Sequence, residues 1–457
     1  MNITIDFTNL FNHDKMPNGI SMNDFKNSEF MCEKAYNLFF SKRTIEPLGF
    51  YDLPDREVDH IIDYAERINS KYDTMVVLGI GGSALGNKAV YRAMRTTKRL
   101  KKLHVYDNVD PSYLDEIIRE IDINKTIFNV ITKSGTTAET MASFMYIISF
   151  LKDKFPNDYQ QRMIVTTDHD KGFLREIIKE EKFKDFIVPN DVGGRFSVLT
   201  DVGLVSFAFL GIDIKALLHG AISMRKHCDE KDWQKNPAMN IALSHVLYLY
   251  KEKNISVMMP YANALFDFAD WYRQLWAESL GKKLDLHGNE VFVGQTPVNA
   301  LGATDQHSQV QLYTEGPDDK IITLIMIDRH NKDMIIPKIY TDRPEVNYLC
   351  NKSFSELLNT ECIATEYALT EAGRPNMTIK FDEINEENIG AFIYLYEAAT
   401  VYAGYMLNIN PLDQPGVESG KIATYALMNK AGYEDEKEKL TNYVNQKSKN
   451  GNILCLS

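Results

Sequence analysis

The 457-residue sequence lacks the features of exported and membrane-spanning proteins. Its first residues have neither a basic nor an apolar signal region, and no apolar run reaches the length needed to cross a bilayer. We therefore expect a cytoplasmic protein with no membrane partner. An excess of positive charge is also missing, and the formal net charge of −12 argues against binding to nucleic acid. A local basic pocket for a small anion is still compatible with this negative net charge.

Cysteine is scarce and never stands in the spacing of a disulfide or metal-binding motif. The five cysteines are scattered, which predicts reduced thiols: Cys32, Cys228, Cys350, Cys362 and Cys455. None of the ten histidines has paired ligand spacing, and Asp168-His169-Asp170 is typical of a turn, so we expect no metal site. The length and the 44% of hydrophobic residues favour two domains or one large two-lobed body.

A hydroxyl-rich turn at 132–137 follows a β-branched and aromatic run at 126–131. Apolar residues at helical spacing follow between 138 and 151, which places the turn at a helix N-terminus. Unpaired backbone N–H groups and the positive end of the helix dipole gather there, so the turn predicts a seat for one phosphate. Side chains would add donors: Thr132, Lys133, Ser134, Thr136 and Thr137. A Ser/Thr N-cap with a solvated lysine explains the same residues, and the spacing is not that of a Walker loop.

A glycine-rich loop at 79–86 follows an earlier buried strand at 75–78. Gly79, Gly81 and Ala84 fit the dinucleotide-binding pattern, and Asp107 follows the next strand at about the right distance, so a nicotinamide-dependent dehydrogenase is a competing interpretation. Parallel strands in a βαβα series end at one edge of the sheet, so this loop and the hydroxyl-rich turn can converge on a single ligand. Hydroxyls and a lysine suit a terminal monophosphate better than a pyrophosphate.

A second glycine-rich segment, at 191–200, has two glycines directly before Arg195. They hold a planar, permanently charged donor close to the main chain, although a lone turn of this kind is more often structural. Together the segments resemble those of the phosphoglucose isomerase family, which is built from two sugar-isomerase (SIS) domains. Six motifs match in order: Gly-Ile-Gly-Gly-Ser at 79–83, Thr-Lys-Ser-Gly-Thr-Thr at 132–137, Val-Gly-Gly-Arg-Phe-Ser at 192–197, Glu-Ser-Leu-Gly-Lys at 278–282, Gln-His-Ser at 306–308 and Asn-Pro-Leu-Asp-Gln-Pro-Gly-Val-Glu-Ser-Gly-Lys at 410–421.

The resemblance implies reversible interconversion of glucose 6-phosphate and fructose 6-phosphate through a cis-enediolate, a step of glycolysis and gluconeogenesis, without metal or organic cofactor. Glu278 would be the base that moves the proton, and Arg195 would lie over the enediolate oxygens. His307 and Lys421 would open the sugar ring. The implied substrate contacts are Gly82, Ser83, Thr132, Lys133, Ser134, Thr136, Thr137 and Gln414. The family is usually dimeric, which implies a homodimer with His307 possibly donated across the interface.

The implied fold is α/β, with two doubly wound parallel-sheet domains of three α-β-α layers and helical N- and C-terminal extensions. The expected divisions are an accessory segment at 1–53, a first SIS domain at 54–210, a helical linker at 211–253, a second SIS domain at 254–432 and a tail at 433–457. The accessory segment should contain a strand at 3–7 and a helix at 23–42. Leu412 stands where the family usually has an aromatic residue, and Asp201 stands where proline is common in the family. These two departures cast doubt on the packing around each of the two positions.

Two further functions stay open. A non-catalytic SIS regulator that binds a sugar phosphate would keep the hydroxyl loops, but it would not need Glu278, His307 and Lys421 together. A metal-assisted hydride-shift isomerase would want clustered carboxylates and histidines, which the spacing does not provide.

Overall fold

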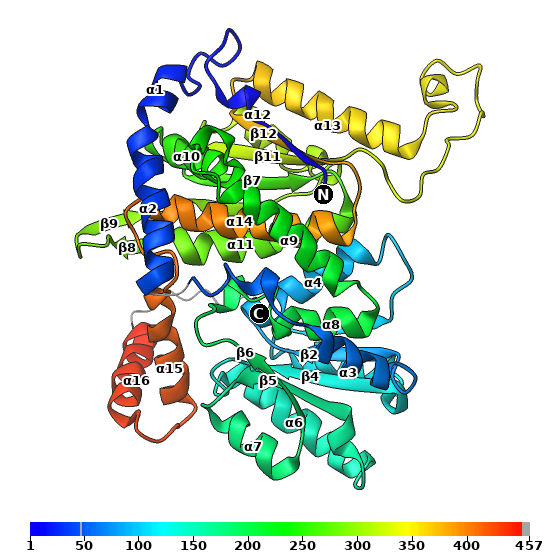
Figure 1. Ribbon diagram of the computed structural model, residues 1–457, viewed down its shortest axis with the longest axis vertical. Helices are drawn as coiled ribbons and strands as arrows, with labels where there is room; N and C mark the ends of the chain where they lie inside the picture. Colours follow the sequence, from blue (N-terminus) through cyan, green and yellow to red (C-terminus); the bar gives the residue numbers. More distant parts are fainter. Residues whose placement is uncertain (46–47, 450–457) are drawn as a thin grey trace. The chain divides into compact units, whose positions relative to one another are not determined.

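The computed structural model describes residues 1–45 and 48–449, which fall into two compact units, Met1–Pro411 and a second that begins at Leu412. Cys455 and the end of the expected tail lie outside the described residues. The first unit contains two five-stranded sheets with helices around and between them (Figure 1). The predicted α/β class with parallel sheets is therefore confirmed. The domain boundaries drawn from the sequence stay predictions.

The first sheet is entirely parallel and has the strand order β3-β2-β4-β5-β6. Every residue of β2, β4 and β5 is buried, as expected for strands covered on both faces. The chain leaves β2 for β3 on one side and then returns to β4 on the other. The strand order thus reverses between β2 and β4, and in open α/β sheets such a switch point is where ligands bind. The strands are β2 (Thr74–Leu78), β3 (Lys102–Tyr106), β4 (Thr126–Ile131), β5 (Met163–Asp168) and β6 (Lys184–Val188).

Helices cover both faces of this sheet and connect its strands (Figure 1). Their bounds are α3 (Asp59–Asn69), α4 (Leu85–Met94), α5 (Pro111–Glu120), α6 (Ala138–Lys154), α7 (Phe173–Glu181) and α8 (Asp201–Leu210).

The second sheet has the order β1-β12-β11-β7-β10, and only β1 runs antiparallel to its neighbour. Its chain path repeats that of the first sheet, because β7 is followed by β10 on one side and by β11 on the other. A second switch point therefore lies between β7 and β11. The strands are β1 (Ile3–Asp6), β7 (Ile255–Pro260), β10 (Thr296–Asn299), β11 (Lys320–Ile327) and β12 (Asn376–Phe381).

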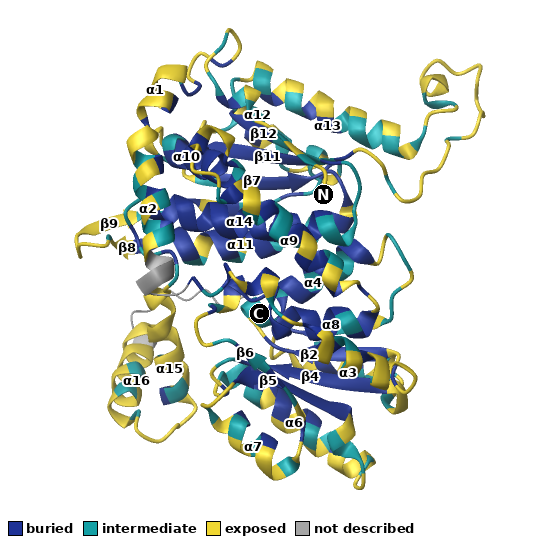
Figure 2. Cartoon of the chain, in the orientation of Figure 1, coloured by how far each residue is buried: buried dark blue, intermediate teal, exposed yellow. Residues whose placement is uncertain are grey.

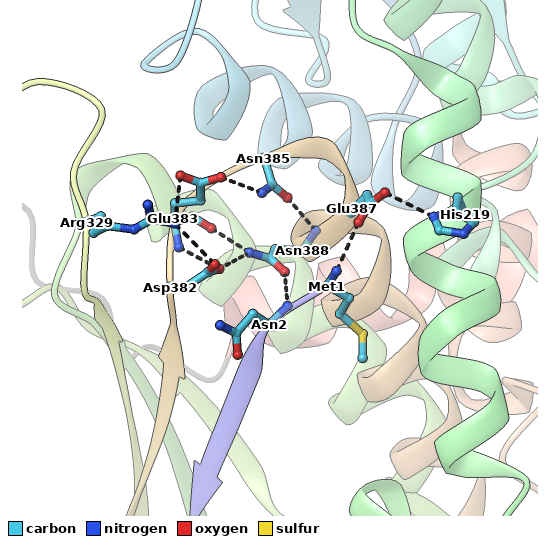
Figure 3. A network of polar contacts seen from close by, with 9 residues as sticks. All are labelled: Met1, Asn2, His219, Arg329, Asp382, Glu383, Asn385, Glu387 and Asn388. Carbon is cyan, nitrogen blue, oxygen red and sulfur yellow. Dashed lines mark hydrogen bonds and ion pairs between the residues drawn. The ribbon is translucent and has the colours of Figure 1, made fainter.

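The N-terminal segment is part of the second sheet as well as an extension. Ile3 pairs with Phe381 at the start of β1, and the backbone N–H of Asn2 donates to the side-chain oxygen of Asn388 at 2.9 Å (Figure 3). The single helix predicted at 23–42 is two helices, α1 (Met22–Asn27) and α2 (Glu29–Ile45), which Ser28 separates.

A layer of helices lies between the two sheets: α9 (Ile214–Cys228), α10 (Pro237–Tyr250), α11 (Phe266–Leu280) and α14 (Glu386–Met406) (Figure 1). Every residue of α14 from Asn388 to Met406 is buried (Figure 2). A Cβ on Gly220 would lie 1.9 Å from the carbonyl oxygen of Glu387, and one on Gly390 would lie 1.8 Å from that of Leu217. Helices α9 and α14 therefore touch backbone to backbone.

The remaining elements lie toward the surface. They are α12 (Val310–Glu315), α13 (Phe354–Glu371), and the two short strands β8 (Lys282–Leu284) and β9 (Glu290–Val293), while the second unit contains α15 (Glu418–Leu427) and α16 (Glu434–Lys449). Over the part of the chain that the structure describes, no helix is long and apolar enough to span a bilayer. Four cysteines are unpaired there: Cys32, Cys228, Cys350 and Cys362.

Candidate active site

Four hydroxyls gather between the end of β4 and the start of α6. The Oγ1 atoms of Thr132 and Thr137 are 3.1 Å apart, and the Oγ of Ser134 lies 3.3 Å from that of Thr137. Ser134 Oγ also accepts from the backbone N–H and the hydroxyl of Thr136, both at 3.3 Å. Thr137 is the N-cap of α6, yet its side chain caps no backbone N–H group of the helix. The cluster thus lies at the positive end of a 17-residue helix dipole, a position suited to an anion.

Lys133 lies in the same turn, but its ammonium is directed at the main chain. Its Nζ donates to the carbonyl oxygens of Asn190 at 2.7 Å and Val192 at 3.0 Å. Burial lowers the pKa of Lys133, and Asp168 and Asp191 oppose that shift. The lysine therefore ties the loop after β6 to the hydroxyl cluster, so it supplies positive charge beside the cluster and also holds the segment that leads to Gly193.

The glycine-rich loop after β2 contacts two other loops. A Cβ on Gly79 would lie 3.2 Å from the carbonyl oxygen of Ile131, the last residue of β4. A Cβ on Gly82 would lie 2.0 Å from the carbonyl oxygen of Gly194 and 2.8 Å from the nitrogen of Arg195. Hence the loop that contains Gly82 and Ser83 lies against both the hydroxyl turn and the arginine segment, at the switch point of the first sheet.

Arg195 is buried, with 2% of its surface exposed. Its Nε donates to Ser279 Oγ at 2.7 Å, its Nη2 donates to the carbonyl oxygen of Pro411 at 2.6 Å, and its Nη1 lies 3.4 Å from Glu278 Oε2. A buried guanidinium with fixed acceptors is held in one orientation. The structure therefore brings Arg195 and Glu278 together, two residues that the sequence could connect only through the family resemblance.

Glu278 lies near the end of α11, with a third of its side chain exposed (33%). Its Oε1 accepts from Gln274 Nε2 at 3.0 Å, one helical turn earlier. A Cβ on Gly81 would lie 3.0 Å from that same nitrogen, so Gln274 connects the glycine-rich loop to the carboxylate. The Oε1 of Gln274 is buried without a hydrogen-bond partner among the described residues. The sequence analysis missed Gln274 and Ser279, although the i, i+4 spacing to Glu278 could have indicated the first.

His307 lies in a short 3-10 helix, η9 (Thr304–His307), and is exposed. Its neighbour Gln306 donates to the hydroxyls of Tyr261 at 2.9 Å and Thr365 at 2.6 Å, which fixes the loop. The Glu278 carboxylate makes its hydrogen bonds with Gln274 and Arg195. The structure thus presents the His307 side chain on the surface.

Gln414 and Lys421 belong to the second unit. Lys421 is exposed in the first turns of α15 and pairs with Glu418 at 2.7 Å, and Gln414 precedes the short helix Pro415–Val417. Asp201, which raised doubt about packing, is accommodated: it is buried at the start of α8, pairs with Arg56 and accepts from the backbone N–H of Ile187 at 2.9 Å.

The described residues contain no group of three or more histidine, cysteine, aspartate or glutamate side chains that could hold a metal ion. At 168–170 the Asp168 carboxylate accepts from the backbone N–H groups of Asp170 at 2.8 Å and Lys171 at 3.0 Å, which closes a bend.

Known proteins match this chain in sequence and in structure over most of its length. The family profile described as phosphoglucose isomerase matches residues 63–449. A glucose-6-phosphate isomerase of Carboxydothermus hydrogenoformans is 42% identical over 452 residues, which cover 96% of this chain and 97% of the relative. One of Rubrobacter xylanophilus is 44% identical over 400 residues, covering 85% and 90%. A crystal structure of a hypothetical protein of Thermus thermophilus matches with a TM-score of 0.84 at 33% identity, covering 94% of this chain and all of that one. This chain belongs to the phosphoglucose isomerase family.

Proposed function

We propose that this protein interconverts glucose 6-phosphate and fructose 6-phosphate, the reaction for which its relatives are named. The observation that carries the proposal is the position of Glu278, whose carboxylate lies 3.4 Å from a buried guanidinium. The same guanidinium belongs to a loop that contacts Gly82 at the switch point where the hydroxyl cluster lies. A base, a fixed cation and an anion seat are thus connected through the first unit.

Glu278 acts as the base in this proposal. Aldose–ketose exchange needs a proton taken from one sugar carbon and returned to its neighbour, and one carboxylate can do both. Gln274 and Arg195 hold the two carboxylate oxygens, which limits the reorientation needed during the reaction. Arg195 supplies preorganised positive charge for the enediolate oxygens, and donors of this kind typically contribute about 3–4 kcal/mol to the transition state.

The hydroxyl cluster binds the phosphate, which takes no part in the chemistry. Contacts to that remote group orient the reacting carbons and so convert binding energy into rate. Ser83, Thr132, Ser134, Thr136 and Thr137 donate from the two loops and from the N-terminal end of α6, with the main chain at Gly82 close by. Lys133 contributes its charge, and its donors to two carbonyls support the neighbouring loop.

We further propose that His307 and Lys421 transfer the protons that open the sugar ring, and that Gln414 binds a substrate oxygen. An exposed imidazole on a fixed loop is available to a second copy of the chain, which favours a homodimer in which His307 serves the partner's site. Sedimentation equilibrium, with mixing of His307→Ala and Glu278→Gln chains, tests this. Activity regained only in the mixed dimer supports donation across the interface, whereas inactive mixtures contradict it.

Conversion of fructose 6-phosphate by the purified chain, treated with a chelator and without nicotinamide, tests the function itself. Glu278→Gln should abolish wash-in of solvent deuterium at the second sugar carbon while leaving substrate binding within a few-fold. Asp270→Asn, an acid on the same helix that pairs with Arg273, is the matched control and should retain full activity. Binding of fructose 6-phosphate without turnover would favour the SIS regulator, and a requirement for added metal would favour a hydride shift.

A further inference from the structure

A cavity of about 360 Å³ lies at the edge of the first sheet that is opposite the hydroxyl cluster. The hydroxyl cluster follows the carboxyl end of β4, whereas the cavity is lined by residues at the amino ends of two neighbouring strands. Gln160 and Gln161 lie just before β5, and Lys182 and Lys184 lie at the start of β6. Because β5 has six residues, the two edges are about 20 Å apart.

Basic side chains dominate the lining of this cavity. Four of the nine described residues that line it are lysine or arginine, and none of the nine is acidic. The chain as a whole has 63 acidic residues against 51 lysines and arginines, so the charge of the cavity is opposite in sign to that of the protein. The four are Arg67 and Lys71, at the end of α3, with Lys182 and Lys184.

Nearby carboxylates leave most of this charge uncompensated. Lys71 Nζ lies 4.0 Å from Asp158 Oδ2, and the same oxygen lies 3.4 Å from Arg162. In the part of the chain that the structure describes, the other three cations have no carboxylate oxygen within 4.0 Å. Even with Asp158 assigned wholly to Lys71, three positive charges remain at the cavity.

The two acidic residues beside the β6 lysines in sequence face other cations. Glu181 pairs with Lys152 at 2.6 Å, and Asp185 pairs with Arg175 at 2.5 Å. On α3, no acid of the described chain forms an ion pair with Arg67. The positive charge of the cavity is therefore not cancelled from the elements that surround it.

The fold itself does not require these cations as helix caps. The carbonyl oxygens of Asn69 and Tyr72 at the end of α3 accept from Lys101 Nζ, and Lys71 donates to Gln161 Oε1 at 2.7 Å. The other three cations donate no hydrogen bond to any residue that the structure describes. Like charges that gather without partners repel one another, so this arrangement is unfavourable in the free protein and favours an anionic ligand.

Aromatic rings hold two of the cations without neutralising them. Lys184 Nζ lies 4.6 Å from the ring centre of Phe186 and 5.6 Å from that of Tyr64, and the Arg67 guanidinium lies 5.8 Å from the Tyr64 ring centre. Attraction to a ring fixes the position of a cation but leaves its net charge. The Tyr64 hydroxyl makes no hydrogen bond with a described residue, and burial raises its pKa, so it keeps its proton and can donate to a ligand.

The charge and size of the cavity define the class of ligand. One phosphate would leave several of the cations unmatched, and a long polyanion would be repelled by the net charge of −12. The volume is that of a small-molecule site. We propose that Tyr64, Arg67, Lys71, Lys182 and Lys184 bind a small anion with three or more negative charges, of the oligophosphate class. The proposal goes beyond the isomerase reaction and does not depend on it, because no residue proposed for isomerisation lines this cavity.

Isothermal titration calorimetry of the full chain with inorganic triphosphate tests the site. Lys182→Gln combined with Lys184→Gln should weaken binding of triphosphate at the cavity at least tenfold, and the unaltered chain should bind triphosphate there at least tenfold more tightly than orthophosphate. Lys179→Gln combined with Lys226→Gln is the matched control, because both are exposed lysines outside the cavity and the net charge changes equally. This control should bind triphosphate as the unaltered chain does.

Ser134→Ala combined with Thr137→Ala, present in every chain compared, removes hydroxyls of the isomerase centre, so the titration reports the cavity even if the protein proves to have no isomerase activity. Adenosine triphosphate at the same affinity as inorganic triphosphate would show that the phosphates alone are recognised, and tighter binding would identify a nucleotide as the source of the oligophosphate. Citrate binding as tightly as triphosphate would overturn the assignment to oligophosphates.

Equal affinity for triphosphate in the unaltered chain and in the chain with both β6 lysines replaced, with both folded as judged by thermal melting, would overturn the proposal. Tyr64→Phe keeps the ring and removes the hydroxyl, so it gives a second measurement if the lysine variant does not fold. We expect a few-fold loss of triphosphate affinity in Tyr64→Phe, and an unchanged affinity there would contradict the site.

Discussion

Replacing Arg195 with lysine separates the two tasks that the structure gives this side chain. The guanidinium presents three nitrogens to three acceptors: Ser279 Oγ at 2.7 Å, the carbonyl oxygen of Pro411 at 2.6 Å and Glu278 Oε2 at 3.4 Å. A lysine ammonium is a single nitrogen without the planar fork, so it leaves at least one buried acceptor unmet. Each unmet buried group costs about 1–3 kcal/mol, which predicts a lower thermal midpoint.

The catalytic effect should be larger than the loss of stability explains. Without a guanidinium aimed at the developing oxyanion, kcat for fructose 6-phosphate should fall about 10²–10³-fold. KM should change little, because the hydroxyl cluster that binds the phosphate is untouched. A coupled spectrophotometric assay at saturating substrate, run well below the thermal midpoint, measures both parameters.

Arg162 provides the matched control. It is also a buried arginine, 7% exposed, and its Nη1 donates to the carbonyl oxygen of Asn124 at 3.0 Å. It directly precedes β5, so it lies at the opposite end of the strand from the site loops. Arg162→Lys should therefore lower the thermal midpoint and leave kcat unchanged. If both lysine variants kept full kcat while losing similar stability, Arg195 would be a structural residue and the catalytic reasoning would be refuted.

Three further predictions use other features of the structure. Gly82→Ala should lower both the thermal midpoint and kcat, because its Cβ would lie 2.0 Å from the carbonyl oxygen of Gly194. A Cβ on Gly194 would meet nothing within 4 Å, so the control variant Gly194→Ala should melt at the same temperature as the unaltered chain. Gln274→Leu should lower kcat about tenfold or more through loss of its bond to Glu278, and an unchanged kcat would show that the carboxylate needs no such support. Both carboxylate oxygens of Glu397 are buried and have no hydrogen-bond partner among the residues described, and this burial raises the pKa of Glu397 well above 4.5. The contribution of Glu397 to the free energy of unfolding is therefore present below the unfolded pKa and is lost as pH rises through the folded pKa. Glu397→Gln should therefore flatten the fall of the thermal midpoint above about pH 5, and parallel pH profiles for the two chains would contradict this.

Local sequence patterns were sufficient to predict the α/β class and the hydroxyl turn. The buried run at 126–131 and the helical spacing after 138 lie within a few residues of each other, so short-range patterns determine that N-terminus. The convergence of the loops after β2 and β4 followed from the geometry of parallel sheets, and the close contact of Gly79 with Ile131 agrees with it.

Contacts between distant segments could not be predicted in this way. Nothing near Gly82 indicates that Gly194 lies against it, and nothing near Arg195 indicates that Ser279 and Pro411 accept its hydrogen bonds. The direction of Lys133 toward two carbonyls was missed for the same reason: composition shows the charge of a side chain but not its partners. Gln274 was missed because an uncharged residue on a helix resembles any solvated position.

The antiparallel strand β1 has a consequence for how the chain folds during synthesis. Ile3 pairs with Phe381, so β1 can join its sheet only after roughly 380 residues have been translated. At about 5–20 residues per second, this translation takes on the order of 20–75 s. All five strands of the first sheet lie between Thr74 and Val188 and can assemble much earlier. The N-terminal segment is thus among the first parts of the chain to leave the ribosome and among the last to form its native strand pairing.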